Sequence, residues 1–390
     1  MRPIQNNYRS TSVILAILGF TYLTLALFSE YWLGIMTHHQ FGADFYIYYD
    51  AFMKSANREN PYLPYDIGSS FVYHPFSLSY LSLFTWQGKP LATYCWIAIS
   101  ILAWVFLLWL AFTFVQKGLG KPISKSARRK FLWTTAIFLG FAPFLETIHI
   151  GQSNIFVILA LCLMFFFSEK KNSLWAGFFL AVAIAFKTSP VIFVFYYLIQ
   201  RNFKIFFSCV IFLLILSIIA SEQFSINVLW DFLGVLPKLG MEIHPTLYNQ
   251  SVLSLAFRAL NKFGFSDVDS LLILCHKILL VIFLSAISLS SLARSSTEFT
   301  RLWEFALLLT LMTIFSPLVW YHHSIFLIIP LLLLLLSPIR LYVVFGIGIL
   351  FIIQFERLFE YLIVPFAMPI LLSHFILLGL GIWIYLSGYN

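Results

Sequence analysis

The chain has 390 residues, of which 61% are hydrophobic and only 10% are charged, too little charge to cover the surface of a soluble domain. Its net charge of +8 does not indicate binding to nucleic acid, because the basic residues lie in short connections between apolar runs. The four cysteines lie in or beside these runs, as buried small hydrophobic residues do, and the chain has no C-x-x-C or H-E-x-x-H motif. The sequence therefore gives no direct support for a metal site and leaves metal dependence open, and we expect no cofactor.

Apolar runs close to the thickness of a bilayer recur along the whole sequence. A spanning helix needs about 20 mostly apolar residues, so the chain has room for roughly ten to twelve spans. The first run, residues 12–34, is longer than the apolar region of a signal peptide, and we interpret it as a span. The sequence predicts one all-α, polytopic integral membrane domain over residues 1–390. The expected spans are 12–34, 92–115, 131–148, 153–168, 173–187, 190–200, 205–221, 270–293, 302–317, 324–337, 341–356 and 368–387.

Basic residues cluster in alternate connections, most densely in 117–130, where six residues are Lys or Arg. The positive-inside rule places these connections, and the N-terminus, in the cytoplasm. Two long segments, 35–91 and 222–269, then lie on the outer face, where we expect them to carry function and interfacial helices. This pattern predicts a multi-pass protein of the plasma (inner) membrane whose active site faces the periplasm or another extracytoplasmic space.

The apolar segment 173–200 is longer than one span needs and is interrupted at 187–190 by Lys, Thr, Ser and Pro. We expect two short helices that meet at a break opening outward, because such residues are tolerated at membrane depth where they line a cavity. A single long helix would instead place Arg294, Arg301 and Arg340 outside, which the charge pattern opposes.

Within this break, Lys187 is the residue that most strongly indicates a function. A lysine at membrane depth costs about 2.5–3.5 kcal/mol on insertion scales, so it usually faces a cavity or a partner. One interpretation is that its ammonium group reaches the outer membrane surface. The other is that it binds a phosphate, which the positive end of a helix starting near Pro190 would also favour.

The first outer segment contains two carboxylates among aromatic residues. If 45–57 is helical, Asp44 lies at its N-cap and could simply bind backbone N–H groups. It could equally act as a general base on a hydroxyl at the membrane surface, with Asp50 as the reserve candidate. We expect the Tyr73-His74-Pro75 turn to be structural, although His74 could face a cleft.

Three more polar clusters fall on the same predicted face. The turn between two spans carries Glu146 and three further polar side chains, which either cap the next helix or bind sugar hydroxyls. The second outer segment carries two side-chain amides, and it has an arginine on a stretch that we expect to form an amphipathic helix. Two adjacent histidines end a later span and could donate to a phosphate or a sugar. Together with Glu146, the three clusters contain His149, Gln152, Asn154, Asn249, Gln250, Arg258, His322 and His323.

The order of the short motifs resembles glycosyltransferase family 87, membrane enzymes of the GT-C type that include polyprenol-phosphate-mannose-dependent mannosyltransferases. The resemblance runs from about residue 40 to residue 330. The motifs are D-F-x-x-Y-Y-D-A (44–51), N-P-Y (60–62), Y-H-P (73–75), G-Q-S-N (151–154), W-A-G (175–177), F-K-T-S-P (186–190), N-Q-S (249–251) and S-P-x-x-W-x-H-H (316–323).

The resemblance implies a GT-C-type helix bundle and an inverting transfer from a polyprenyl-phosphate-linked sugar to a lipid or glycan acceptor on the outer face. The matching acidic residue, Asp44, would be the general base. Lys187, His322 and His323, with Arg258, would bind the donor phosphate. We assign substrate binding to Asp50, Tyr73, His74, His149, Gln152, Asn154, Asn249 and Gln250. His74 stands where the family often has proline, which leaves the donor sugar open.

A transporter or flippase of a lipid or lipid-linked sugar is the main alternative, since it would share the spans, the broken helix and the intramembrane lysine. Transport predicts polar residues throughout the bilayer and two related halves. The polar clusters of this chain instead gather on one face, and its sequence shows no clear internal symmetry. A membrane acyltransferase would need a stronger nucleophilic or histidine-based constellation than His322 and His323 provide.

Overall fold

The computed structural model describes residues 40–66, 70–121, 125–246, 248–265, 268–293, 297–354 and 369–387. Every regular element in these ranges is a helix. The helices are α2 (Ala43–Ala56), α3 (Phe76–Thr85), α4 (Lys89–Gly118), α5 (Lys125–Leu139), α6 (Ala142–Ile150), α7 (Asn154–Glu169), α8 (Ser173–Phe186), α9 (Val191–Ile199), α10 (Phe203–Phe224), α11 (Asn227–Leu239), α12 (Val252–Lys262), α13 (Asp269–Ala293), α14 (Glu298–Ile314), the 3₁₀-helix η2 (Tyr321–Leu327), α15 (Ile328–Leu335), α16 (Arg340–Gln354) and α18 (Pro369–Ser387).

The all-α membrane fold is confirmed. Among the described residues, α4, α10 and α13 are long and apolar enough to cross a bilayer, and the pair α5–α6, bent by 56°, could form a fourth span. Several other apolar helices have 10–17 residues, so the total of ten to twelve spans stays a prediction. The expected first span, 12–34, lies outside the described residues.

The predicted break in the segment 173–200 is confirmed. Helix α8 ends at Phe186 and α9 begins at Val191, with Lys187 as the C-cap residue of α8. The proline at 190 has no N–H to continue the helical hydrogen bonds, and it precedes α9, where that donor would be unused in any case.

The centre of the bundle is formed by α14 and α15. Residues 302–314 of α14 and all of α15 are buried, as expected for helices that are apolar on every side. Elsewhere in the bundle, α8 lies against α10 at Gly177, where an added Cβ would be 2.7 Å from the backbone nitrogen of Cys209. A residue without a side chain is therefore what lets these two helices approach.

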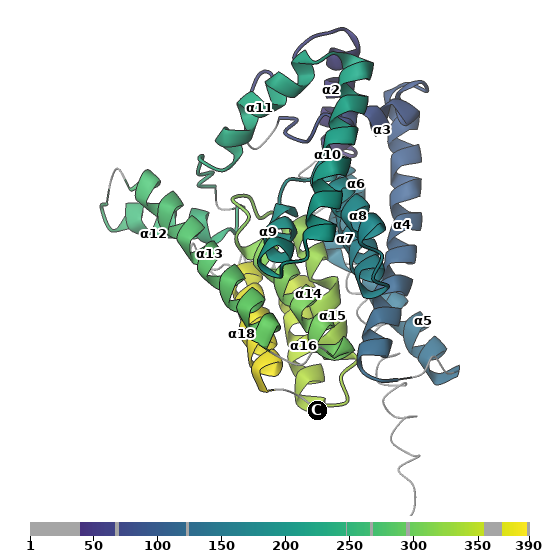
Figure 1. Cartoon of the computed structure of the whole chain (residues 1–390), viewed down its shortest axis with the longest axis vertical. Coiled ribbons are helices and arrows are strands. Elements are labelled where there is room, and N and C mark those ends of the chain that lie inside the picture. The colour runs from purple at the N-terminus through teal and green to yellow at the C-terminus, as the bar shows by residue number, and fades with distance from the viewer. Residues whose placement is uncertain are drawn as a thin grey trace, which may run out of the picture.

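The short helices α2, α3 and α11 gather at one end of the bundle, while α5 lies near the opposite end (Figure 1). The first group packs around Trp96 of α4, whose ring stacks on Phe45 of α2 with 5.5 Å between ring centroids. The indole Nε1 donates to the backbone carbonyl of Gly151 at 2.8 Å. Trp96 therefore fixes α2 against the turn between α6 and α7.

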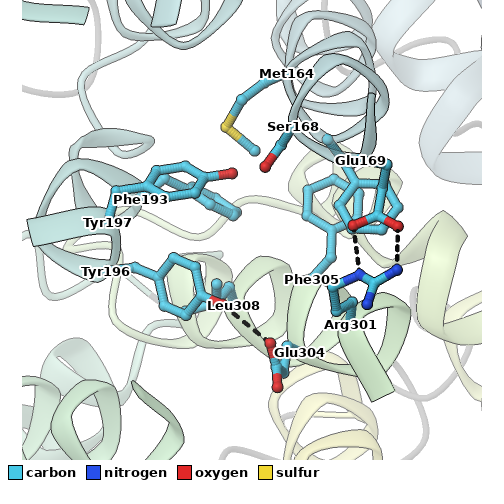
Figure 2. A pocket seen from close by; sticks show the side chains of 11 residues that line it. Met164, Ser168, Glu169, Phe193, Tyr196, Tyr197, Arg301, Glu304, Phe305 and Leu308 are labelled. Carbon is cyan, nitrogen blue, oxygen red and sulfur yellow. Dashed lines mark hydrogen bonds and ion pairs between the residues drawn. The ribbon is translucent and has the colours of Figure 1, made fainter. Parts of the chain in front are cut away.

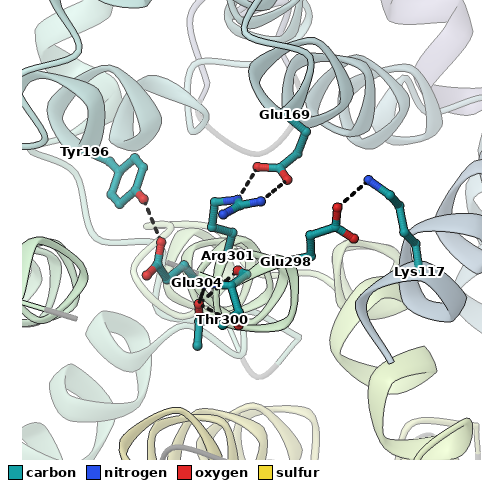
Figure 3. A network of polar contacts seen from close by, with 8 residues as sticks. Lys117, Glu169, Tyr196, Glu298, Thr300, Arg301 and Glu304 are labelled. Carbon is teal, nitrogen blue, oxygen red and sulfur yellow. Dashed lines mark hydrogen bonds and ion pairs between the residues drawn. The ribbon is translucent and has the colours of Figure 1, made fainter. Parts of the chain in front are cut away.

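At the end away from α2, α14 is joined to neighbouring helices by charged side chains (Figure 3). Glu298 pairs with Lys117 of α4, with 2.6 Å between Oε1 and Nζ. The Arg301 guanidinium donates to both carboxylate oxygens of Glu169 on α7, at 2.6 and 2.8 Å. The half-buried Arg301–Glu169 pair has the two-pronged geometry that favours a fixed arrangement.

A cavity of about 60 Å³ lies beside this pair, between α7, α9 and α14 (Figure 2). Glu304 reaches it from α14 and accepts hydrogen bonds from the Tyr196 hydroxyl of α9 at 3.0 Å and the Tyr385 hydroxyl of α18 at 2.8 Å. Glu304 thus joins α14 to both α9 and α18 beside the cavity.

Candidate active site

Asp44 lies in the first turn of α2, and its carboxylate is directed to the turn between α6 and α7. The N-cap expectation is wrong: Gly42 occupies that position, with φ 74°, and its backbone N–H donates to the carbonyl of His149 at 2.8 Å. The Asp44 Oδ2 atom accepts a hydrogen bond of 2.5 Å from Nε2 of Gln152. Because the Asp44 carboxylate does not cap α2, it can bind other groups.

The turn between α6 and α7 supplies the partner of Asp44. Gly151 has φ 75°, a conformation that favours glycine, and an added Cβ would be 2.7 Å from Cβ of Phe45. Gln152 follows, largely buried, and its Oε1 accepts from the Tyr48 hydroxyl at 2.8 Å and from the Ser153 N–H at 3.1 Å. The turn and the first two turns of α2 thus form one hydrogen-bonded unit.

Lys187 extends from the break between α8 and α9 to two other elements. Its Nζ donates to Oδ1 of Asn154, the first residue of α7, at 3.1 Å, and is hydrogen-bonded to Nε2 of His323. The same ammonium lies 5.8 Å from the ring centroid of Phe326. The side chain is anchored within the bundle, and it is only half-buried.

The two adjacent histidines of η2 point to different partners. The Nδ1 atom of His323 accepts from the backbone N–H of Trp320 at 2.8 Å, which turns Nε2 toward Lys187. The ring of His322 lies against that of His323, and its Nδ1 is 3.9 Å from a carboxylate oxygen of Glu146. His323 therefore joins the lysine, while His322 faces the carboxylate.

Burial raises the pKa of Asp44 from 3.8 to about 6, although the hydrogen bond from Gln152 and the positive charge of Lys187 lower it. The lysine therefore lies close enough to act on the carboxylate. A carboxylate whose pKa lies near neutrality can both accept and release a proton at physiological pH. Asp44, Lys187 and His323, which come from three separate segments, form the polar group that we call the Asp44–His323 cluster.

Asp50, predicted to bind substrate, pairs instead with a lysine at the surface, and Arg258, predicted to bind phosphate, contacts the segment around it. Asp50 is exposed, and both of its carboxylate oxygens lie 2.8 Å from Nζ of Lys89. Arg258 directs Nη1 to the carbonyl of Thr246 at 2.5 Å and to the hydroxyl of Ser254 at 2.7 Å. Arg258 thus stabilises the segment 222–269, and these contacts do not support the phosphate-binding role predicted for it.

Asn249 and Gln250 join the segment 222–269 by hydrogen bonds to residues 317–319, which precede η2. The buried Asn249 side chain donates to the carbonyls of His244 and Pro317, at 2.9 and 3.0 Å, and accepts from the N–H of Val319 at 3.0 Å. The backbone N–H of Gln250 donates to the carbonyl of Val319 at 2.8 Å. These residues support the segment that carries the histidines.

His74 joins the segment 35–91 to α10. Its Nε2 is 3.1 Å from the hydroxyl of Ser217, and its Nδ1 accepts from the backbone N–H of Phe76 at 3.2 Å. Burial lowers the pKa of His74 to about 4. The preceding residue, Tyr73, has its hydroxyl 3.2 Å from that of Tyr48. Of the two, Tyr73 is the one that reaches the partners of Asp44.

Two supporting residues were not selected from the sequence. Tyr48 lies one helical turn after Asp44, a spacing that puts both on one face of α2, and this signal could have identified it. Gln354 donates to the carbonyl of Gly140 at 3.1 Å and accepts from the N–H of Ala142 at 2.8 Å, across the bend between α5 and α6. No local pattern in the sequence indicates that long-range pairing.

The model of glycosyltransferase family 87 matches residues 71–317 of this chain. The matched range contains the turn at Gln152 and the break at Lys187, and it begins after Asp44 and ends before His323. A search of curated proteins finds no match.

Proposed function

The chain belongs to glycosyltransferase family 87, and from that premise we propose that it transfers a sugar from a polyprenyl-phosphate donor to a lipid or glycan acceptor on the outer face of the plasma membrane. Family membership and the apolar helices make it a membrane glycosyltransferase. We propose in addition the class of donor, the class of acceptor, inversion at the anomeric carbon and a site on the outer face. Mannose is the donor sugar that the family resemblance favours.

The observation that carries the proposal is that one short segment, 152–154, binds both a carboxylate and an ammonium. Asp44 binds Gln152 in the α6–α7 turn, and Lys187 binds Asn154, the first residue of α7, two positions later in the sequence. A glycosyl transfer from a phosphate needs a base for the acceptor and a cation for the leaving group. The cluster provides both on separate side chains, and each is partly exposed.

In the proposed reaction, the Asp44 carboxylate takes the proton of an acceptor hydroxyl as that oxygen attacks the anomeric carbon. The new carbon–oxygen bond forms on the face opposite the departing phosphate, so the configuration inverts. The bond from the anomeric carbon to the phosphate oxygen breaks, and its electron pair leaves with the polyprenyl phosphate. Lys187 and the His323 side chain stabilise the negative charge that grows on this phosphate.

The proposed outer location rests on charge. The Lys117–Glu298 pair and Arg301 lie at the end of α14 away from the cluster, in the connections that the positive-inside rule assigns to the cytoplasm. The cluster adjoins α2, which belongs to the segment 35–91 at the other end of the bundle (Figure 1). A lipid-linked donor would then present its sugar at the surface where α2 lies.

The test uses detergent-purified protein with radiolabelled polyprenol-phosphate-mannose and a total lipid extract of its host. We expect label to pass to a new glycolipid or glycan with wild type and with Asp50→Asn, and we expect Asp44→Asn to transfer none. Equal transfer by Asp44→Asn would leave the enzyme class standing and remove Asp44 as the base. In proteoliposomes, label that crosses the bilayer without chemical change would favour transport and contradict the proposal.

A further inference from the structure

The amide group of Gln152 is oriented by its surroundings. Its oxygen accepts from the Tyr48 hydroxyl at 2.8 Å and from the Ser153 N–H at 3.1 Å. A backbone N–H cannot donate to the side-chain nitrogen of glutamine, because that nitrogen is itself a donor. The nitrogen must then be the atom that faces Asp44, where it donates to Oδ2 at 2.5 Å. The hydrogen-bond network therefore fixes which way this amide points.

We propose that Gln152 is a positioning residue for the proposed base, holding the Asp44 carboxylate in one orientation so that Oδ1 is the oxygen that takes the acceptor proton. This inference rests on the proposed function. It replaces the expectation that Gln152 binds sugar hydroxyls, because both ends of its side chain are already used within the protein and it is 8% exposed.

The geometry of α2 makes the hold on Asp44 rigid. Gln152 bonds to Asp44 and to Tyr48, which are one helical turn apart on the same face, so its amide is held at both ends by one element. The Gly42–His149 backbone bond fixes the start of that turn. Within the described residues, Oδ2 carries the bond from Gln152 and Oδ1 accepts none, so Oδ1 is the oxygen open to a substrate.

Gln152 also affects the protonation of Asp44. A hydrogen bond to the ionised form favours ionisation, while burial opposes it, and both act here. The other ionisable groups around the carboxylate are Lys187, which favours its ionisation, and the phenols of Tyr48 and Tyr73. Removing the amide leaves burial opposed by Lys187 alone, and the carboxylate would then need a higher pH to ionise.

The experiment measures kcat and KM against pH for wild type, Gln152→Met and Gln152→Glu. We expect activity of wild type to fall below about pH 6 as Asp44 is protonated. For Gln152→Met, which keeps the length of the side chain, we expect this fall to move up by about one pH unit and the plateau of kcat to drop ~10-fold, with KM for the acceptor little changed. For Gln152→Glu we expect a larger upward shift, because two carboxylates in contact cannot both ionise easily.

The matched control is Tyr48→Phe, which removes a partner of the Gln152 oxygen and keeps the donor to Asp44. Because the Ser153 N–H still orients the amide, we expect the activity of Tyr48→Phe to decline at the same pH as that of wild type. A raised KM for the acceptor with an unshifted pH profile in Gln152→Met would overturn the proposal and indicate sugar binding. A uniform loss of activity at every pH would also overturn it and indicate a structural role.

The same measurements separate this inference from the proposed function. If Asp44→Asn keeps activity, the proposed base is wrong. If Asp44→Asn is inactive and the Gln152 variants keep the wild-type pH profile, only the positioning role fails. Should Gln152→Met yield no folded protein, Gln152→Glu, which preserves the size of the side chain, decides the question alone.

Discussion

The raised pKa of Asp44 predicts that this carboxylate destabilises the folded protein whenever it is ionised. Because the folded state binds the proton more tightly than the unfolded chain, stability falls as pH rises from 3.8 through about 6 and is constant above. Asp44→Asn has nearly the same shape and can still accept from Gln152, but it carries no proton to lose. We therefore expect the variant to be more stable than wild type at neutral pH.

The size of the effect follows from the shift. A rise from 3.8 to about 6 corresponds to about 3 kcal/mol of stability lost above pH 6. For a chain of 390 residues this is about 4 °C in Tm. Well below pH 3.8 Asp44 is protonated in both the folded and the unfolded state, so this contribution vanishes there.

The assay is thermal unfolding of the detergent-purified protein, followed by tryptophan fluorescence at pH 4.5, 6 and 8. Asp50→Asn is the control, because an exposed ion pair such as Asp50–Lys89 contributes only ~0–1 kcal/mol. We expect the Tm of Asp44→Asn to exceed that of wild type by a margin that grows with pH. A margin that is the same at pH 4.5 and pH 8, or that shrinks with pH, would refute the reasoning. No substrate is needed, so the test is independent of the proposed reaction.

Three further variants test other parts of the structure. Lys187→Gln should lower kcat by ~10²-fold, because it removes the cation proposed to stabilise the leaving phosphate, and steady-state kinetics with the lipid donor measure this. Asp50→Asn should retain transfer activity within about twofold in the same assay, since Asp50 pairs with Lys89 at the surface. Gly177→Ala should lower stability by ~1–3 kcal/mol, measured by thermal unfolding, because its Cβ would be 2.7 Å from the Cys209 nitrogen.

The features that could be predicted from the sequence are those with a local physical cause. The break between α8 and α9 follows from lysine and proline in an apolar run, and the structure has it at 187–190. Helices were expected within the segments 35–91 and 222–269, and the structure has α2 and α3 in the first and α11 and α12 in the second. Each of these signals depends on residues that are neighbours in the chain.

The features that could not be predicted depend on contacts distant in sequence. Nothing near Asp44 indicates that Gly42 takes the N-cap and that Gln152, 108 residues later, takes the carboxylate. The bonds of Glu304 to Tyr196 and Tyr385 likewise link helices whose order in space the sequence does not give. Periodicity shows which residues are apolar, but the partner of a buried polar group is set by the packing of whole helices.

Each part of the proposed site lies where a helix is interrupted. Asp44 follows the glycine that starts α2, Gln152 lies in the turn after Gly151, and Lys187 lies in the break before Pro190. Interrupted backbone in a membrane protein leaves N–H and C=O groups that lipid cannot satisfy, so it persists where it lines a cavity or is buried in protein. The bonds from Gly42 and from Trp96 to the α6–α7 turn satisfy two of these groups and also set the distance between Asp44 and Gln152. The glycines, the proline and the polar residues that break the apolar runs therefore position the carboxylate and the ammonium of the proposed site against the segment 152–154.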